Sequence, residues 1–243
     1  PMFHANSWGM PYGAVMMGAK MVFPGPHLHA DDLLDLMQLE PPTLSLGVPT
    51  IWMSLIQTFE AAQTGQPGRW KMPAGMRSMV GGSAVPESLI RAFAKHGIAL
   101  QQGWGMTETS PLATVSYPRE VSVMPQPCCK TETSPLATVS YPRAELRDAG
   151  ADEAFRRAAM AGTPVPLVDV RICGEDGREA AHDGKSPGEV QVRGPYITGS
   201  YHEVPVSPEK FTADGWLRTG DVATMDELAI MRITDRTKDL IKS

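Results

Sequence analysis

The first hundred residues alternate between hydrophobic positions at helical spacing and short apolar runs typical of strands. Residues 13–19 are small and apolar and predict a helix. Residues 20–24 then predict a short strand that ends at Pro24. Repeated strand–helix alternation predicts a largely parallel sheet with helices on its faces and ligand loops at the carboxyl ends of its strands. The predicted helices are 31–39, 50–62 and 86–93, and the predicted strands are 43–49, 77–80 and 98–100.

The last eighty residues have a different pattern. Residues 168–172, 188–194 and 229–233 alternate with the period of two that is typical of half-buried strands. A charged, alanine-rich segment at 144–161 precedes them and predicts an exposed helix that ends at Gly162. We therefore predict an α/β fold, in which a parallel sheet with flanking helices over 1–161 is followed by a smaller antiparallel β subdomain over 162–234.

The composition excludes several classes of protein. The chain has 243 residues, and its formal net charge of -5 argues against the concentrated basic face that nucleic-acid binding needs. No apolar run approaches the roughly 18 residues of a membrane span, and the start of the chain lacks a signal peptide, so a cytoplasmic protein is expected. The three cysteines and six histidines form neither a disulfide framework nor a zinc-ligand pattern.

The stretch from Gly103 to Pro111 has the chemistry of a loop that handles nucleotides. The indole of Trp104 can stack on a base, and glycines such as Gly105 let the backbone approach a ligand closely. Thr107 can donate a hydrogen bond to a phosphate oxygen, and Glu108 can hold Mg²⁺ beside that phosphate. The alternative from these residues alone is a hydroxyl-rich turn with a buried tryptophan.

Part of this stretch occurs twice. The thirteen residues from Thr107 recur unchanged at 131–143, after an offset of 24 residues. A single short repeat is not a solenoid, which needs several stacking units, so a tandem duplication or a sequence-assembly error explains it better. Only the first copy follows Gly103-Trp104-Gly105, and we therefore assign chemistry to the first copy and expect the second to be a surface loop.

Four stretches, in order, resemble the signature motifs of the adenylate-forming superfamily, which includes acyl-CoA synthetases, luciferases and peptide-synthetase adenylation domains. The opening residues Pro1-Met2-Phe3-His4-Ala5-Asn6-Ser7-Trp8 look most like medium- and long-chain fatty acyl-CoA synthetases. The fold expected from this resemblance is that of their large N-terminal domain. The four stretches are Gly81 to Pro86, Gly103 to Pro111, Asp214 to Asp221 and Asp235 to Ser243.

The resemblance implies roles for individual residues. Trp104 would stack on adenine, the Gly81-Gly82-Ser83 backbone would line the base, Thr107 and Glu108 would face the α-phosphate and Mg²⁺, and Asp221 would bind the ribose. These assignments make Thr107 and Glu108 the catalytic candidates and Glu108 the metal ligand.

Further roles come from the ends of the chain. Arg236 matches a second ribose contact, and Lys238 matches a hinge, so that 235–243 would begin the connection to a C-terminal domain. Trp8 matches an aromatic gate at the fatty-acyl tunnel, and His4 matches a position near the carboxylate; ordinary core packing is the alternative for Trp8. The family's Asp-Gly turn is replaced here by residues 227–229, so we expect a less well-formed turn.

The implied reaction has two steps and uses ATP, Mg²⁺ and CoA. A carboxylate, from a fatty acid or another acid, attacks the α-phosphate of ATP to give acyl-AMP, and the CoA thiol then displaces AMP. The family's phosphate loop is expected before Pro1 and its catalytic lysine after Ser243, so we expect no acyl-CoA formation by residues 1–243 alone and a possible homodimer of the full-length parent. The alternatives are an aryl-CoA ligase, a peptide-synthetase adenylation domain or a non-catalytic nucleotide-binding remnant.

Overall fold

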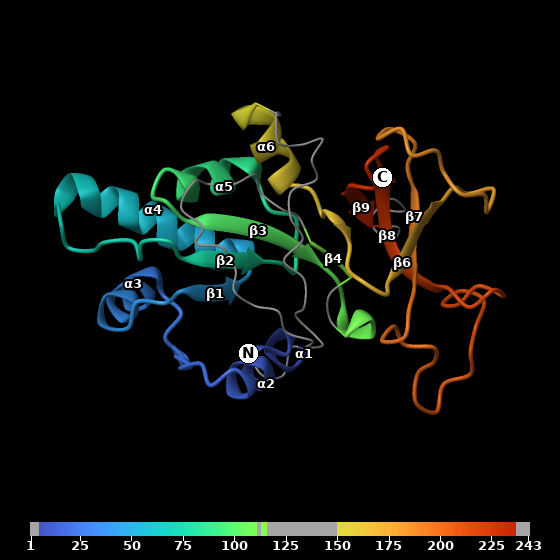
Figure 1. Cartoon of the computed structure of the whole chain (residues 1–243), viewed down its shortest axis with the longest axis horizontal. Helices are drawn as coiled ribbons and strands as arrows, with labels where there is room; N and C mark the ends of the chain where they lie inside the picture. The colour runs from blue at the N-terminus through green and yellow to red at the C-terminus, as the bar shows by residue number, and fades with distance from the viewer. Residues whose placement is uncertain (1–4, 111–112, 116–149, 237–243) are drawn as a thin grey trace. The chain divides into compact units, whose positions relative to one another are not determined.

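The structure is a computed structural model, and it describes residues 5–110, 113–115 and 150–236. Contacts group these residues into two compact units, each described by itself below (Figure 1). The α/β unit comprises residues 10–102 and 150–159. The β unit comprises the remaining described residues, 5–9, 103–110, 113–115 and 160–236.

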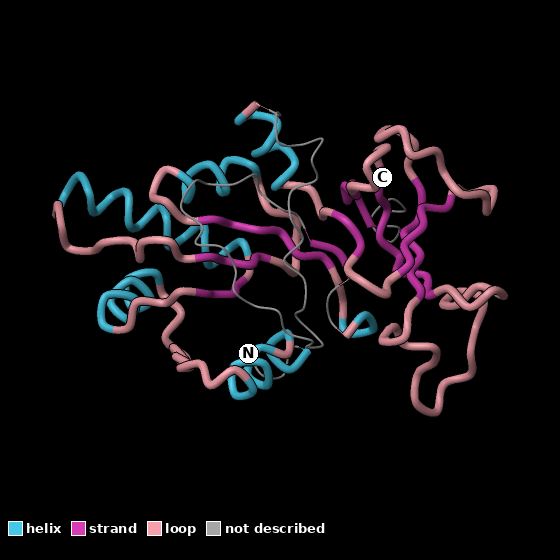
Figure 2. Tube along the Cα trace, in the orientation of Figure 1, coloured by secondary structure: helices cyan, strands magenta, loops and turns pink. Residues whose placement is uncertain are grey.

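The α/β unit is built on three parallel strands joined by helices (Figure 2). Strand β1 (Leu44–Gly47) pairs with β2 (Arg77–Val80), with Leu44 opposite Arg77. Strand β2 pairs in turn with β3 (Ala99–Trp104), with Arg77 opposite Ala99. The carboxyl ends of these strands therefore lie at one edge of the sheet. The elements of the unit are α2 (Met10–Met16), α3 (Ala30–Leu39), β1 (Leu44–Gly47), α4 (Pro49–Gly65), β2 (Arg77–Val80), α5 (Glu87–Ala94), α6 (Ala151–Ala158) and the first four residues of β3 (Ala99–Trp104), whose last two residues belong to the β unit.

One apolar cluster holds this unit together. Helix α4 begins with Pro49 at its first turn, where proline costs no hydrogen bond, and its Leu55 is fully buried. The ring of Trp52 meets that of Phe93 on α5 edge to face, with centroids 5.7 Å apart. Each fully buried side chain of this kind contributes about 1.5–3 kcal/mol. The helical spacing of the apolar residues thus determines which faces of α4 and α5 pack together.

The β unit contains two small sets of antiparallel strands. The last residues of β3 pair with β4 (Thr114–Val115), which pairs with β5 (Thr163–Pro164). The larger sheet has the order β6-β7-β8-β9. Its strands are β6 (Asp169–Cys173), β7 (Gly188–Arg193), β8 (Leu217–Met225) and β9 (Met231–Arg236), and the unit also contains the short helices α1 (Ala5–Trp8) and η1 (Thr107–Thr109).

The predicted α/β fold with a parallel sheet followed by antiparallel strands is confirmed. Two local predictions are wrong. Residues 20–24 form no strand: they are mostly exposed and make no ladder, although residues 21–24 are apolar. The turn before β9 is well formed, because the carboxylate of Asp226 accepts hydrogen bonds at 2.9 Å from the backbone N–H groups of both Leu228 and Ile230. Ala229 occupies the left-handed region there, with φ of 57°.

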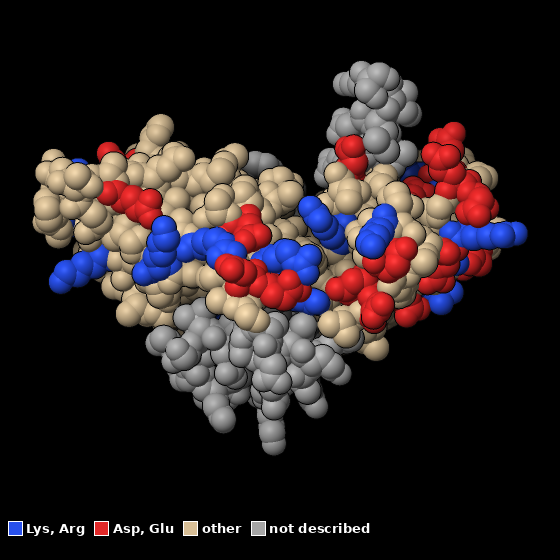
Figure 3. All heavy atoms as spheres, turned by 90° about the horizontal axis from the view of Figure 1, so that it is seen from above, with Lys and Arg blue, Asp and Glu red and all other residues tan. Residues whose placement is uncertain are grey.

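Charges of both signs are interspersed on the face of the molecule in Figure 3. Within the α/β unit, several charged side chains are paired: Arg91 contacts Glu87 at 2.6 Å and Asp152 at 2.9 Å, and thereby links α5 to α6. On α6, Glu153 receives hydrogen bonds from Arg156 and Arg157, and these bonds lower the pKa of its carboxyl group. Exposed pairs of this kind each contribute little to stability, so apolar packing dominates in this unit.

Candidate functional site

Two of the motif residues, Trp104 and Asp221, are in direct contact within the β unit. Trp104 is the last residue of β3, where its carbonyl accepts a hydrogen bond from the N–H of Ala113 at 2.9 Å. Its indole Nε1–H donates to Oδ2 of Asp221 at 2.9 Å. The indole ring is partly exposed, whereas Asp221 is 7% exposed. The fold therefore joins a partly exposed aromatic ring to a buried carboxylate that lies 117 residues further along the chain.

A bulge in β8 presents Asp221. Glu189 of β7 pairs with Val222 and Gln191 pairs with Arg218, so residues 219–221 lie opposite the single residue Val190. Gly220 adopts φ of 75°, which is accessible to glycine at no steric cost. β-Bulges commonly re-aim a side chain next to a functional site. The Thr-Gly-Asp sequence is thus the local cause of the placement of Asp221.

Thr219 closes this bulge. Its hydroxyl donates to the carbonyl of Val190 at 2.8 Å and accepts a hydrogen bond from the N–H of Asp221 at 3.2 Å. Both contacts are buried. Thr219 therefore fixes the backbone of the bulge, whereas the indole N–H of Trp104 donates to the carboxylate itself and offsets part of the cost of burying it.

The turn after Trp104 separates a structural threonine from an exposed one. Thr109 is fully buried; its hydroxyl accepts from the N–H of Met106 at 2.9 Å and donates to the carbonyl of the same residue at 3.0 Å. Thr107, at the start of η1, is exposed. The turn therefore fixes its own geometry through Thr109 and leaves the hydroxyl of Thr107 accessible.

Glu108 is held by the segment Tyr196–Tyr201. The hydroxyl of Tyr201 donates to Oε1 of Glu108 at 2.9 Å, and the backbone N–H of Thr198 donates to the carbonyl oxygen of Glu108 at 2.9 Å. Next to it, the hydroxyl of Ser110 donates to the carbonyl of Tyr196 at 2.8 Å. Tyr201 and Thr198 lie outside the four recognised motifs, so no sequence signal pointed to either residue.

The Gly81-Gly82-Ser83 loop belongs to the α/β unit and follows β2. Gly82 adopts φ of 87°, so a side chain at this position would be strained. Gly81 N–H donates to the carbonyl of Gly47 at 3.3 Å, and both Gly82 and Ser83 are exposed. The loop lies at the carboxyl ends of parallel strands, the usual place for ligand loops in α/β sheets.

The other predicted site residues are less defined. Trp8 is partly buried with φ of 56°, and no ring contact of its indole is found in the described part of the chain. The backbone of Arg236 lies across from Asp221 in the β8–β9 ladder. His4, Lys238 and the second copy of the motif, 131–143, lie outside the described residues.

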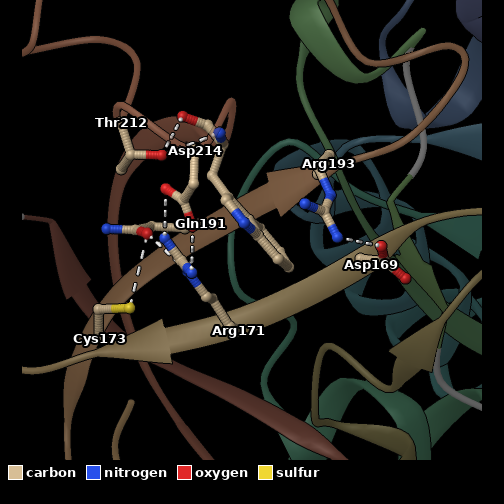
Figure 4. Close-up of polar contacts among 8 residues, drawn as sticks. Asp169, Arg171, Cys173, Gln191, Arg193, Thr212 and Asp214 are labelled. Carbon is tan, nitrogen blue, oxygen red and sulfur yellow. Dashed lines mark hydrogen bonds and ion pairs between the residues drawn. The ribbon is translucent and has the colours of Figure 1, made fainter. Parts of the chain in front are cut away.

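The Asp214-Gly215-Trp216 stretch is fixed by arginines from neighbouring strands (Figure 4). The guanidinium of Arg171 is directed at the carboxylate of Asp214, at 2.9 and 3.2 Å, and also donates to Gln191 at 2.9 Å. Arg171 and Arg193 both lie over the Trp216 ring, at 4.3 and 4.5 Å from its centroid. Trp216 is 8% exposed, so this part of the motif packs the sheet.

The hydrogen bond from Thr212 and the pairing with Arg171 lower the pKa of Asp214 to about 2.

Among the described residues, no three His, Cys, Asp or Glu side chains gather into a group that could hold a metal. None of the helices in the described ranges is long and apolar enough to cross a bilayer.

The donor chemistry of Glu108 fits Mg²⁺. This ion prefers oxygen ligands, and it is usually bound through one or two carboxylates together with substrate phosphates and water. Glu108 offers a partly exposed carboxylate, and its neighbour Thr107 offers an exposed hydroxyl. With a nucleotide phosphate beside them, Glu108 is suited to hold a Mg²⁺ that would neutralise the phosphate charge, and the hydroxyl of Thr107 is suited to donate a hydrogen bond to a phosphate oxygen.

The model of the family described as AMP-binding enzyme matches residues 1–202. The chain is 38% identical over 244 residues to a long-chain-fatty-acid–CoA ligase from Thermus thermophilus, and this alignment covers 100% of the chain and 40% of the relative. It is 37% identical to a medium-chain-fatty-acid–CoA ligase from Ectopseudomonas oleovorans, with 100% and 39% coverage. The chain thus spans about 40% of the length of these curated relatives.

Among solved structures, the chain is similar to the N-terminal domain of FACL13 from Mycobacterium tuberculosis, with a TM-score of 0.69 and 24% identity over 97% of this chain and 49% of that one. It is also similar to the O-succinylbenzoate coenzyme A synthetase MenE from Bacillus subtilis in complex with AMP, with a TM-score of 0.66 and 20% identity over 98% and 40% of the two chains. At these identities the likeness concerns the fold.

Proposed function

The chain belongs to the AMP-binding enzyme family, and on this basis we propose that it forms the nucleotide- and acyl-binding part of an ATP-dependent fatty acyl-CoA synthetase. The observation that carries the proposal is the contact between Trp104 and Asp221. It places a partly exposed aromatic face beside a buried carboxylate, and these two groups suit the adenine and the ribose of one adenosine.

The remaining site residues take roles consistent with that core. Thr107 and Glu108 face the phosphates and the Mg²⁺ that accompanies them. Gly81, Gly82 and Ser83 line the base. No side chain is required as a nucleophile, because the acid substrate itself attacks the α-phosphate, and the protein contributes positioning and charge neutralisation.

The proposal includes further ligands and residues. Arg236 supports the ribose, Lys238 lies at the hinge, and Gly105 allows close approach of the nucleotide. Trp8 and His4 contact the fatty acid, and CoA is the final acceptor. A cytoplasmic location and a homodimer of the complete protein are also predicted; cell fractionation and size-exclusion chromatography with light scattering test them.

Calorimetric titration of AMP into the complete protein that carries residues 1–243 tests the nucleotide site. Trp104→Ala removes a stacking face that contributes roughly 1–3 kcal/mol. Asp221→Ala removes charge-assisted bonds that contribute about 1.5–3 kcal/mol. Each variant should therefore bind AMP about tenfold more weakly or worse.

The matched control is Glu132→Ala, which changes the glutamate of the second motif copy and should leave AMP affinity unchanged. Equal affinities for the unsubstituted protein and all three variants would mean that the assignment of this site is wrong. A loss at Glu132 as large as that at Asp221 would show that the chemistry was assigned to the wrong copy.

A further inference from the structure

The segment Thr198–Tyr201 contacts Glu108 at both its backbone and its side chain. The backbone bond from Thr198 and the hydroxyl bond from Tyr201 are both 2.9 Å long. One contact fixes where the residue lies, and the other fixes the orientation of its carboxylate. A glutamate side chain has three rotatable bonds, so a partly exposed one with a free carboxylate would sample many orientations.

Tyr201 is itself well placed to act as a rigid donor. Its ring packs against Phe211, with centroids 6.0 Å apart. A tyrosine phenol carries its proton at neutral pH, so the hydroxyl of Tyr201 donates to the carboxylate of Glu108. A bond from a hydroxyl to a carboxylate is charge-assisted and is stronger than one between neutral groups.

The bond leaves one side of the carboxylate available. Tyr201 donates to Oε1, and no hydrogen bond to Oε2 of Glu108 is found in the described ranges of the chain. A carboxylate has about four lone-pair sites, so an oxygen held in this way still presents the other oxygen to a cation. Residues that hold a metal-ligating carboxylate typically change metal affinity by 10–100-fold when they are lost.

We propose that Tyr201 is a positioning residue for Glu108: its hydroxyl holds Oε1 so that Oε2 is presented to the Mg²⁺ of a bound nucleotide. This inference rests on the proposed function, because it assumes that Glu108 meets the metal. It adds a residue from outside the recognised motifs and gives the Tyr196–Tyr201 segment a role in metal binding rather than only in folding.

The test compares two tyrosines of one segment in the complete protein. Tyr201→Phe keeps the ring against Phe211 and removes only the hydroxyl. Tyr196→Phe removes a hydroxyl that donates to the carbonyl of Pro166 and does not touch Glu108. ATP binding is measured by calorimetry over a range of Mg²⁺ concentrations, and AMP binding is measured without metal.

Tyr201→Phe should raise the Mg²⁺ concentration for half-maximal enhancement of ATP binding about tenfold or more and leave metal-free AMP affinity unchanged. Tyr196→Phe should change neither value. An unshifted Mg²⁺ midpoint in Tyr201→Phe would overturn the inference, as would an equal shift in both tyrosine variants, since that would indicate a general disturbance of the loop.

Glu108→Gln separates this inference from the proposed function. If Glu108→Gln shifts the Mg²⁺ midpoint but Tyr201→Phe does not, the metal role of Glu108 stands and the role of Tyr201 fails. If Glu108→Gln has no effect, both fail. In the supporting outcome, adding Tyr201→Phe to Glu108→Gln causes no further shift, because the tyrosine acts through the carboxylate.

Discussion

In the described part of the chain, two tryptophan–aspartate hydrogen bonds have opposite patterns of burial. In the α/β unit, Nε1 of Trp70 donates to Oδ1 of Asp35 at 2.6 Å; the ring is 2% exposed and the aspartate is exposed. In the β unit, Trp104 donates to Asp221 at 2.9 Å; the ring is partly exposed and the aspartate is 7% exposed. The buried partner is thus the tryptophan in the α/β unit and the aspartate in the β unit.

The first arrangement stabilises the fold. The apolar body of Trp70 is removed from water while its N–H reaches a solvated acid, so neither group is poorly solvated. The second arrangement keeps a carboxylate largely away from water and leaves an aromatic side chain partly exposed, which is unfavourable for stability by itself. Such an inversion is consistent with the nucleotide site proposed above.

Truncation of the first tryptophan should give the largest effect. Trp70→Ala removes a buried aromatic ring from the apolar cluster and should lower the free energy of unfolding by about 3–5 kcal/mol. Urea unfolding of the complete protein measures this loss, and the AMP affinity of the folded fraction should not change. A loss below 1 kcal/mol, or a specific loss of AMP binding, would remove the distinction between the two pairs.

Trp104→Phe should have an intermediate effect on stability. It keeps a flat ring but removes the N–H donor from a buried carboxylate, which should lower the free energy of unfolding by about 1–3 kcal/mol. Because a stacking face remains, AMP affinity should fall less than in Trp104→Ala. If urea unfolding finds no loss while calorimetry finds the full loss of the alanine variant, the indole N–H does not hold Asp221 as described.

An exposed aspartate provides the smallest effect and the sharpest contrast with Asp221. The lowered pKa of Asp214, from 3.8 to about 2, means that its charge stabilises the folded state above pH 3.8 and that this contribution is lost as the pH falls through about 2. Asp214→Asn should therefore reduce stability slightly at neutral pH and flatten the loss of stability between pH 4 and 2. Thermal unfolding across that range, with exposed Asp176→Asn as a control, measures the difference; parallel curves would contradict it.

The elements of the α/β unit were largely predictable, because apolar spacing and turn residues decide them locally. Strand β2 was predicted at 77–80, where it is observed, and the helix predicted at 50–62 is observed as Pro49–Gly65. Strand β8, the longest, was not predicted, because Thr219-Gly220 interrupts its pattern and indicates a turn. The opposite error occurred at residues 20–24, where a strand was predicted and none is observed.

The contacts of the candidate site were less predictable than its residues. The residues Trp104 and Asp221 were identified from motifs, but the bond between them joins positions 117 residues apart and depends on the tertiary fold. Tyr201 gave no local signal, since its function depends on a partner 93 residues away. The well-formed turn before β9 was also not predicted, although it is local. The carboxylate of Asp226 forms the hydrogen bonds of this turn, in which a glycine had been expected.

The bulge at residues 219–221 also bears on how this protein can change in evolution. It adds two residues to β8 relative to β7, and an even number of added residues returns every following side chain to its original face. Removal of two residues here would leave an ordinary strand and an intact sheet. Removal of one residue would instead move every following side chain of the strand to the opposite face of the sheet. A lineage can therefore lose the presentation of this carboxylate in one step and still inherit the fold.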